Sequence, residues 1–430
     1  KVEIIGGKGP SGFDFGDTVK TINWICSGMT DVQESSLSRP SRYWSAQLSS
    51  ANKPFPCENS AGRAHFVGWD QAPYLTGIPY SSGENGYTCI KIPVLVRTQN
   101  RTLLAIAEAR KFTCSDFAWT DLVIKSSHDN GLTWSAMRVI RTESGPGLPH
   151  TVIGNAAPVQ LARTGRILLP HTRNNSDVWI THSDDDGETW SEPVEIKNGT
   201  RPGWKWVGTG PPASIQLRSG RIIVPSYHSI YRGNLINNIV HGHVMLSDDE
   251  GYSWRIGGTM EKKGDAMVNE CQAVELKNGS VLINARSFAT LTTEQRIQTL
   301  SNDGGLSFGP TSFVPSLPQP FDGCEGSTVQ TSTGILFFTG PDSHVKRDHM
   351  TLWRSEDEGT SWKKQLLLDP GASGYSALVV VDPESDSLGL LYEQSDQDEL
   401  IMAPDRFVYR AIPQPKKQEG TLDLINVSNI

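Results

Sequence analysis

The sequence contains no long apolar run: none approaches the roughly 18 consecutive apolar residues that a membrane-spanning helix needs. Lys and Arg occur in no run longer than two residues, and the 39 basic side chains are outnumbered by 47 acidic ones, for a formal net charge of −8. A broad basic face that binds nucleic acid is therefore not expected. The length of 430 residues suits two or three average domains, or one large β-sheet architecture.

Cysteine is scarce, with six residues in the chain. The cysteines have no CxxC spacing and no histidines at zinc-ligand spacing, so we expect neither a metal site nor a cofactor. Their even number permits disulfides. Together with five N-x-[ST] sequons and a first residue that is Lys, this favours a processed protein of the secretory pathway, secreted or extracellular. The sequons begin at Asn100, Asn174, Asn198, Asn278 and Asn426.

Glycine and proline, by contrast, are plentiful, with 41 and 26 residues, and one octapeptide pattern returns five times. The pattern S-x-D-x-G-x-[ST]-[WF] begins at Ser127, Ser183, Ser247, Ser301 and Ser355. The intervals of 56, 64, 54 and 54 residues match one four-stranded sheet with its turns, which is the unit of a β-propeller. In each copy the Asp carboxylate is expected to accept backbone N–H groups, the Gly to supply a positive φ, and the aromatic residue to pack beside the turn.

A second repeat of two apolar stretches lies between the octapeptides and predicts inner hairpins. Counting residues 92–107, which precede the first octapeptide, and 377–392, which have no octapeptide after them, gives six hairpins. We therefore predict an all-β fold, a six-bladed β-propeller whose last blade is closed by strands from both chain ends, including residues 407–410. Residues 86–430 would form this propeller, and residues 1–85 an extension that contributes to it or caps it.

The antiparallel order of the strands also predicts which residues share one end of the propeller. The start of the first strand and the end of the second lie at the same end of a hairpin, whereas the octapeptide turns lie at the other end. The residues expected at the shared end are Lys91, Asn155, Gly210, Glu270, Glu325 and Tyr375 from first strands and Arg110, Arg173, Tyr227, Arg286 and Glu393 from second strands. The loop of residues 111–119 adds Asp116, and Arg347 opens the third strand of its blade.

At these residues the chain resembles the exo-sialidases of the sialidase/neuraminidase superfamily, which are retaining glycosidases on six-bladed propellers with Asp boxes. The resemblance implies that Arg286 and Arg347 are two members of the arginine triad that binds the substrate carboxylate. It implies that Tyr375, in Gly-Tyr-Ser-Ala, is the nucleophile and that Glu270, in Asn-Glu-Cys-Gln, activates it. Asp116 matches the acid/base aspartate.

Two further site residues follow from the resemblance, and one of them departs from it. Glu393 resembles the carboxylate that steadies the first triad member. That first member is an arginine in an F/Y-R-I-P motif, whereas this chain has Lys91 in Cys-Ile-Lys-Ile-Pro. Lysine keeps the charge but loses the planar fork that binds a carboxylate through two parallel hydrogen bonds. The clamp is then either weakened or reshaped for a related acidic sugar.

Other assignments stay open at this stage. Arg110 and Glu108 are interpreted as sugar contacts or supports, and Asp121 is the alternative to Asp116 as the acid. The leading hypothesis is a monomeric exo-α-sialidase that acts on sialylated glycans. The rivals are a glycan- or protein-binding propeller without activity and an enzyme that transfers the sugar to another glycan. Possible disulfides are Cys26–Cys57, Cys89–Cys114 and Cys271–Cys324, among 15 pairings of six cysteines.

Overall fold

The computed structural model describes residues 2–4, 20–22, 76–143, 145, 147–230, 239–288, 294–320, 323–397 and 403–414. The chain divides into two compact units, Lys1–Pro73 and Tyr74–Ile430. In the first unit, β1 (Val2–Ile4) pairs antiparallel with β2 (Lys20–Ile22). Cys26, Cys57 and Asn426, for which the sequence predicts a disulfide and a sequon, lie outside the described residues.

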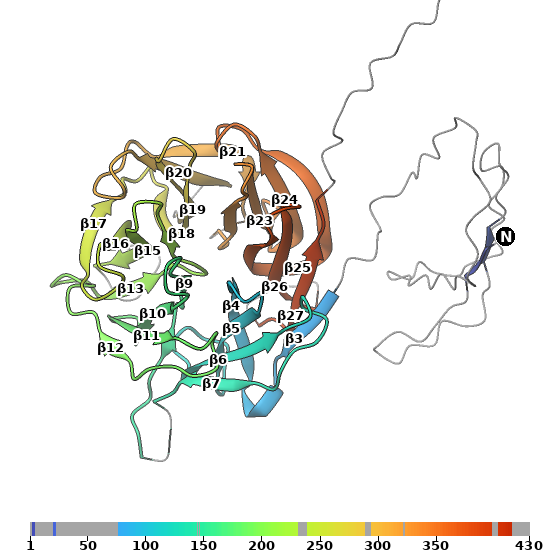
Figure 1. Ribbon diagram of the computed structural model, residues 1–430, viewed down its shortest axis with the longest axis horizontal. Helices are drawn as coiled ribbons and strands as arrows, with labels where there is room; N and C mark the ends of the chain where they lie inside the picture. Colours follow the sequence, from blue (N-terminus) through green and yellow to red (C-terminus); the bar gives the residue numbers. More distant parts are fainter. Residues whose placement is uncertain are drawn as a thin grey trace, which may run out of the picture. The chain divides into compact units, whose positions relative to one another are not determined.

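The second unit is built of antiparallel sheets that follow one another around a centre (Figure 1). A short 3-10 helix, η2 (Glu84–Gly86), lies just before the first strand of the first sheet. The first sheet contains β4 (Cys89–Arg97), β5 (Leu103–Arg110), β6 (Thr120–Ser127) and β7 (Arg138–Arg141). The second contains β8 (Ile153–Gly154), β9 (Val159–Gln160), β10 (Ile167–Arg173), β11 (Asp177–Ser183) and β12 (Val194–Glu195). The all-β, propeller-like arrangement predicted from the repeats is confirmed.

The third and fourth sheets repeat the scheme. The third contains β13 (Trp206–Thr209), β14 (Ile215–Gln216), β15 (Ile222–Ser229), β16 (Val240–Ser247) and β17 (Arg255–Thr259). The fourth contains β18 (Met267–Glu275), β19 (Val281–Phe288), β20 (Gln295–Ser301) and β21 (Ser312–Pro318). Among the parts of the chain that the structure describes, no helix is long and apolar enough to cross a membrane.

The last sheet has seven strands because one long strand, β25 (Lys363–Asp382), belongs to two four-stranded arrays. The first part of β25 pairs with β24 (Asp348–Ser355), which follows β22 (Ser327–Gln330) and β23 (Leu336–Pro341). The second part pairs with β26 (Ser387–Gln394), which pairs with β27 (Arg406–Ile412). β27 contains the predicted strand 407–410, and its other neighbour is β3 (Thr76–Ser81), from the N-terminal side of β4. Strands from both ends of this unit therefore lie in one array.

Apolar side chains pack between successive sheets and hold them in this order. The β5 residues Leu104 and Ile106 pack with Ile153 and Leu169 of the second sheet. Similar clusters join the second sheet to the third and the third to the fourth. The last array returns to the first sheet through a cluster that contains Phe407 with residues of β5, all buried. Burial of both faces explains why β5 is apolar along nearly its whole length.

Each of the five octapeptide turns contains the same two hydrogen bonds. In the first, Oδ1 of Asp129 accepts the backbone N–H of Thr133 at 2.9 Å, and Oγ of Ser127 accepts that of Gly131 at 2.9 Å. The equivalent bonds occur in the other four turns. Gly131 has φ +89°, and a Cβ there would lie 2.1 Å from the Tyr409 ring, so glycine is required by conformation and by space.

The strand register fixes the two ends of the first sheet. Cys89 pairs with Arg110, and Arg110 pairs with Thr120 at one end. Leu103 pairs with Ser127, the first residue of the octapeptide, at the other end. The octapeptide turn and the predicted site residues Lys91 and Arg110 therefore lie at opposite ends of this sheet.

One of the predicted disulfides forms and one does not. Cys89 and Cys114 are bonded, with Cα atoms 5.3 Å apart. The predicted Cys271–Cys324 bond is wrong, because both are free, buried thiols. The Sγ atom of Cys271 lies 3.8 Å from the Ser226 carbonyl, toward the third sheet, whereas Cys324 packs with Ile92 and Tyr375. The two side chains thus face different neighbours.

Candidate active site

Tyr375, Glu270 and Arg286 share one set of hydrogen bonds at the end of the sheets where the sequence predicts the site. They lie in β25, β18 and β19. The Tyr375 hydroxyl donates to Glu270, with Oη 2.6 Å from Oε1 and 2.8 Å from Oε2. Nη1 of Arg286 donates to Tyr375 Oη at 2.9 Å and to Glu270 Oε2 at 2.8 Å. A phenol, a carboxylate and a guanidinium therefore meet at one oxygen atom.

Burial sets the protonation state of this tyrosine. Tyr375 is 7% exposed, and burial raises its pKa well above the usual value near 10. The neighbouring charge of Glu270 raises the pKa further, while the charges of Arg286 and Arg347 act in the opposite direction. The phenol is therefore protonated at neutral pH, with a carboxylate in contact that can accept its proton.

Two more cations face the ring of the same tyrosine. Lys91 Nζ, from β4, lies 5.8 Å from the Tyr375 ring centroid. The guanidinium carbon of Arg347, just before β24, lies 5.2 Å from it. With Arg286 at the hydroxyl, three cationic side chains from three sheets surround one aromatic ring. Such a group can hold an anionic substituent of a ligand directly above the phenol.

Glu393, in β26, connects the strands that carry Lys91 and Tyr375. Its Oε1 accepts the N–H of Ile92 at 3.0 Å and lies 3.8 Å from Lys91 Nζ. Its Oε2 accepts the N–H of Tyr375 at 3.3 Å. Glu393 is fully buried, and burial lowers the pKa of Lys91, an effect that the negative charge of Glu393 opposes.

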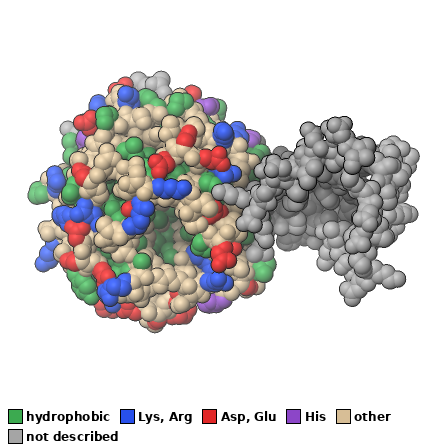
Figure 2. All heavy atoms as spheres, turned by 45° about the horizontal axis from the view of Figure 1, so that its top comes forward, with side chains coloured by type: hydrophobic (Ala, Val, Ile, Leu, Met, Phe, Trp, Pro, Cys, Tyr) green, Lys and Arg blue, Asp and Glu red, His purple; other side chains and the backbone are tan. Residues whose placement is uncertain are grey.

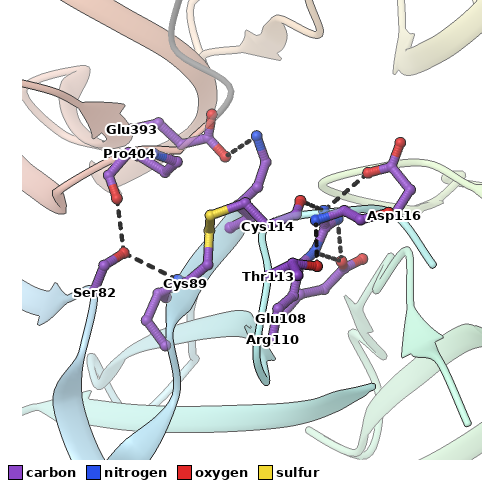
Figure 3. Close-up of a disulfide and its surroundings, with 12 residues drawn as sticks. Ser82, Cys89, Glu108, Arg110, Thr113, Cys114, Asp116, Glu393 and Pro404 are labelled. Atoms are coloured by element: carbon purple, nitrogen blue, oxygen red, sulfur yellow. Dashed lines mark hydrogen bonds and ion pairs between the residues drawn. A yellow bond between two sulfur atoms is a disulfide. The ribbon is translucent and has the colours of Figure 1, made fainter. Parts of the chain in front are cut away.

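Asp116 lies in the loop of residues 111–119 and is held through Arg110 (Figure 3). Arg110 donates from Nε and Nη2 to Oε2 of Glu108, at 3.1 and 2.6 Å. Its Nη1 donates to Oδ1 of Asp116 at 2.9 Å and to the Cys114 carbonyl at 2.6 Å. The surrounding protein partly screens the Asp116 carboxylate from bulk water and would raise its pKa, but the charges of Arg110 and Lys91 outweigh this effect and hold the pKa below the usual value. The carboxyl group is therefore ionised in the free protein, and its side chain is 63% exposed.

Asp121, the alternative acid, has a different environment. It lies in β6 and is 2% exposed. Its Oδ1 accepts the Thr142 hydroxyl at 2.7 Å, and its Oδ2 accepts the Tyr87 hydroxyl at 2.8 Å and lies 3.1 Å from Lys111 Nζ. Both carboxylate oxygens are thus engaged, and the ion pair with Lys111 holds the first sheet to the loop 111–119.

Two features near the site had no assigned role in the sequence. Glu325 is 1% exposed, and its Oε2 accepts the N–H of Ser376, the residue after Tyr375, at 2.8 Å. Phe117 is 55% exposed and lies edge-on to Trp206, with ring centroids 5.7 Å apart, beside Asp116. The sequence indicated the contact of Glu325 only through its position at the start of a first strand. Nothing in the sequence indicated the Phe117–Trp206 contact, because it joins segments about 90 residues apart.

Charges elsewhere on the second unit are mixed. Figure 2 shows basic and acidic side chains interspersed over one face, with a hollow in its middle. Among the described residues, no group of three or more His, Cys, Asp or Glu side chains could hold a metal ion. The cations around Tyr375 are therefore a local feature and not part of a broad basic face.

Comparison with known proteins identifies a matching family model and several similar proteins. Residues 171–386 match the family model described as "BNR repeat-like domain". The chain is 26% identical to a sialidase of Bacteroides fragilis over 352 residues, which cover 73% of this chain and 61% of that protein. It is 30% identical to human sialidase-4 over 313 residues, which cover 66% of this chain and 60% of that protein. Among solved structures, Hadza microbial sialidase Hz136 superposes with a TM-score of 0.66 at 26% identity, over 78% of this chain and 68% of that one.

The fold and the site define a β-propeller that gathers a tyrosine, carboxylates and three cations at one end of its sheets. The chain belongs to the BNR repeat-like domain family, within the sialidase superfamily. An intramolecular trans-sialidase of Ruminococcus gnavus shares the fold at 15% identity, with a TM-score of 0.64, over 78% of this chain and 97% of that one. The chain spans about three-fifths of the length of the two curated sialidases named above.

Proposed function

We propose that the protein is a retaining exo-α-sialidase that hydrolyses terminal sialic acid, or a related nonulosonic acid, from glycoconjugates. The observation that carries the proposal is the contact of the Tyr375 hydroxyl with Glu270 and Arg286, with Lys91 and Arg347 at the ring. The family relationship supports it.

The chemistry of the sugar explains a tyrosine nucleophile. A sialic acid carries its carboxylate on the anomeric carbon, so an attacking Asp or Glu would meet a like charge at the reacting atom. The Tyr375 phenol is neutral, and Glu270 takes its proton as the oxygen attacks. The C–O bond to the aglycone breaks as the bond to Tyr375 forms, and water later releases the sugar with net retention.

Asp116 supplies the second proton transfer. Its contact with Arg110 keeps it ionised in the free protein, so it must gain a proton before it can act as the acid. It then protonates the leaving glycosidic oxygen and becomes the base that removes a proton from the attacking water. Acid/base help of this kind contributes about 10²- to 10⁴-fold.

The cations Lys91, Arg286 and Arg347 bind the substrate carboxylate in this proposal. Each charge-assisted hydrogen bond is stronger in a partly dry site than in water. Glu393 holds Lys91 in place, and Arg110 contacts the sugar or supports Asp116. Lys91 provides a point charge where a guanidinium would provide two parallel hydrogen bonds, which favours a clamp of altered shape.

The wider organisation is part of the same proposal. Counting the two arrays that share β25 separately gives six blades, with the octapeptide turns as Asp boxes at the end away from the site. In this proposal residues 86–430 are the propeller and residues 1–85 the extension, which contributes β3 to the array of β27. The Cys89–Cys114 disulfide supports a protein of an oxidising compartment, which we take to be secreted and monomeric.

Release of fluorophore from an aryl α-sialoside between pH 4 and pH 7 tests the proposal. Turnover is expected, with free sialic acid as the product. Binding of sialyl-lactose without any turnover would instead indicate a binding propeller. Product analysis with lactose as an acceptor separates hydrolysis from transfer, because transfer would give sialyl-lactose.

A further inference from the structure

The Cys89–Cys114 disulfide joins the strand that carries Lys91 to the loop that carries Asp116 (Figure 3). We propose that this disulfide is a positioning element, which holds Asp116 where it can protonate the leaving group. The inference rests on the function proposed above and adds a residue pair that acts through Asp116 rather than on the sugar.

The loop of residues 111–119 is held together mainly by short-range bonds of its own. Lys111 N–H donates to the Trp119 carbonyl at 2.8 Å and closes the loop, and Ala118 N–H donates to the Ser115 carbonyl at 2.9 Å. The loop contains no strand or helix, and Phe112 and Phe117 are 73% and 55% exposed. These contacts fix the shape of the loop but not its place above the sheets.

The hydrogen bonds and the covalent bond that place the middle of the loop lie at Cys114 and Asp116, whereas the Lys111–Asp121 ion pair and the contact of Phe117 with Trp206 hold its neighbouring parts. Cys114 is bonded to Cys89, which is fully buried at the start of β4. Arg110 donates to the Cys114 carbonyl at 2.6 Å and to the Asp116 carboxylate at 2.9 Å through the same Nη1. Asn175 Nδ2 adds a longer bond of 3.3 Å to the Asp116 carbonyl.

Arg110 and the disulfide both hold Cys114, one by a hydrogen bond and the other by a covalent bond. Cys89 and Arg110 are paired across β4 and β5, so the covalent bond and the guanidinium start from neighbouring positions. Both reach Cys114, and Asp116 follows two residues later. Without the covalent bond, Asp116 would be placed by the bonds of Arg110 to its carboxylate and to the Cys114 carbonyl, by the long bond from Asn175 and by the contact of Phe117 with Trp206. None of these contacts is covalent, and a misplacement of about 1 Å can cost about 10²-fold in rate.

The nucleophile does not depend on this bond. Tyr375 and Glu270 lie in strands β25 and β18, which the loop does not join. Loss of the disulfide should therefore impair protonation of the leaving group and leave attack by Tyr375 intact. A substrate whose leaving group departs without protonation distinguishes these two effects.

The experiment compares kcat/KM for an aryl α-sialoside, which releases an acidic phenol, with kcat/KM for sialyl-lactose, which releases a sugar alcohol. This quantity reports steps up to the first irreversible one, so it reports Asp116 as an acid and not as a base. For Cys89→Ser/Cys114→Ser we expect a loss of about 10- to 100-fold with sialyl-lactose and less than about 3-fold with the aryl substrate.

Two controls separate positioning from general damage. Ser82→Ala removes a hydroxyl that accepts the Ile90 N–H at 3.2 Å and donates to the Pro404 carbonyl at 2.7 Å, so it loosens β4 next to Cys89 without touching the loop. It should change both rates by the same factor. In an Asp116→Ala background, removal of the disulfide should cause no further selective loss with sialyl-lactose.

Reduction of the folded wild type provides a second route if the double variant does not fold. A dithiol gives up two electrons and two protons, the S–S bond becomes two thiols, and the dithiol becomes a cyclic disulfide. Cys114 is half-buried, so the bond is open to attack from solvent. Treatment should reproduce the selective loss in the wild type and change nothing in Cys89→Ser/Cys114→Ser.

Equal losses with both substrates, or no loss, would overturn the positioning role while leaving the proposed function intact. Absence of turnover with either substrate in the untreated wild type would instead refute the proposed function itself.

Discussion

The Tyr375 hydroxyl lies 2.6 Å from Oε1 of Glu270, although the two residues are 105 positions apart in the sequence. The contact joins the second part of β25 to β18, and Arg286 donates to both partners. Burial raises the pKa of Tyr375 well above 10, so in the proposed mechanism the phenol attacks only as a base removes its proton. Glu270 is the carboxylate in contact, and we propose it as that base.

Replacement of Glu270 by Gln should lower kcat with the aryl α-sialoside by about 10²- to 10⁴-fold, the range typical of general base catalysis. Glutamine keeps the size of the side chain and can still accept the Tyr375 hydrogen bond through its amide oxygen, but it cannot take the proton. KM should change much less, because the cations that bind the carboxylate remain.

Steady-state kinetics with Glu270→Asp beside it provides the control. Aspartate keeps the charge at a shorter reach, so part of the activity should survive. If Glu270→Gln retains wild-type kcat, Glu270 is a structural partner of Arg286 and not the base.

Lys91 predicts a pH dependence of ligand binding. Burial lowers its pKa below the usual value of 10.5, and the charges of Arg110 and Arg347 act in the same direction against Glu393. The ammonium group binds a carboxylate only while it is protonated. As the pH rises through this lowered pKa, the charge is lost and the Kd for sialic acid should increase.

Calorimetric titration of wild type and Lys91→Arg with sialic acid, from neutral pH into the alkaline range, checks this prediction. Arginine stays charged throughout, so the Kd of the variant should remain flat where that of the wild type rises. Parallel pH profiles for the two proteins would place Lys91 outside the ligand site.

A cluster of neutral histidines lies in the third sheet. His228, in β15, has its Nδ1 3.1 Å from Nδ1 of His243, in β16, and its ring stacks on Trp204 with centroids 3.7 Å apart. Burial, with the charges of His241 and Arg201, lowers the pKa of His228 to about 3. Burial also lowers the pKa of His243 well below 6.5.

These pKa shifts predict a loss of stability in acid. Below pH 6.5 the histidines bind protons in the unfolded chain but stay neutral in the folded protein. The free energy of unfolding therefore falls as the pH falls, by about 1.4 kcal/mol per pH unit for each such histidine. Urea unfolding at pH 7, 6 and 5 measures this slope. His228→Phe keeps the ring against Trp204 and should reduce the slope; an unchanged slope would show that His228 does not contribute to it.

The repeat made the fold largely predictable from the sequence. The octapeptide fixed the turns, and residues 92–107 form the predicted hairpin as the end of β4 and the start of β5. Residues 407–410 lie in β27 as expected. Local turn chemistry and apolar stretches decide these features, and both can be recognised in a single sequence.

Side-chain direction and protonation were not predictable in the same way. Cys271 and Cys324 occupy similar positions in successive predicted hairpins. Cys271 nevertheless faces the third sheet, whereas Cys324 faces Tyr375. The lowered pKa of Asp116 depends on its contact with Arg110, a pairing set by the shape of the loop and not by spacing. The roles proposed for Tyr375, Glu270 and Asp116 rest on the family resemblance and on their geometry, and they stay predictions.

The most direct test of the account is to identify the residue that bonds to the sugar. The protein is incubated with 2,3-difluorosialic acid, and the intact mass and the peptide map are then measured. The account predicts one added glycosyl group, attached through the Tyr375 oxygen and absent from Tyr375→Phe. An adduct on Glu270 or Asp116, or catalysis by Tyr375→Phe at the wild-type rate, would contradict it.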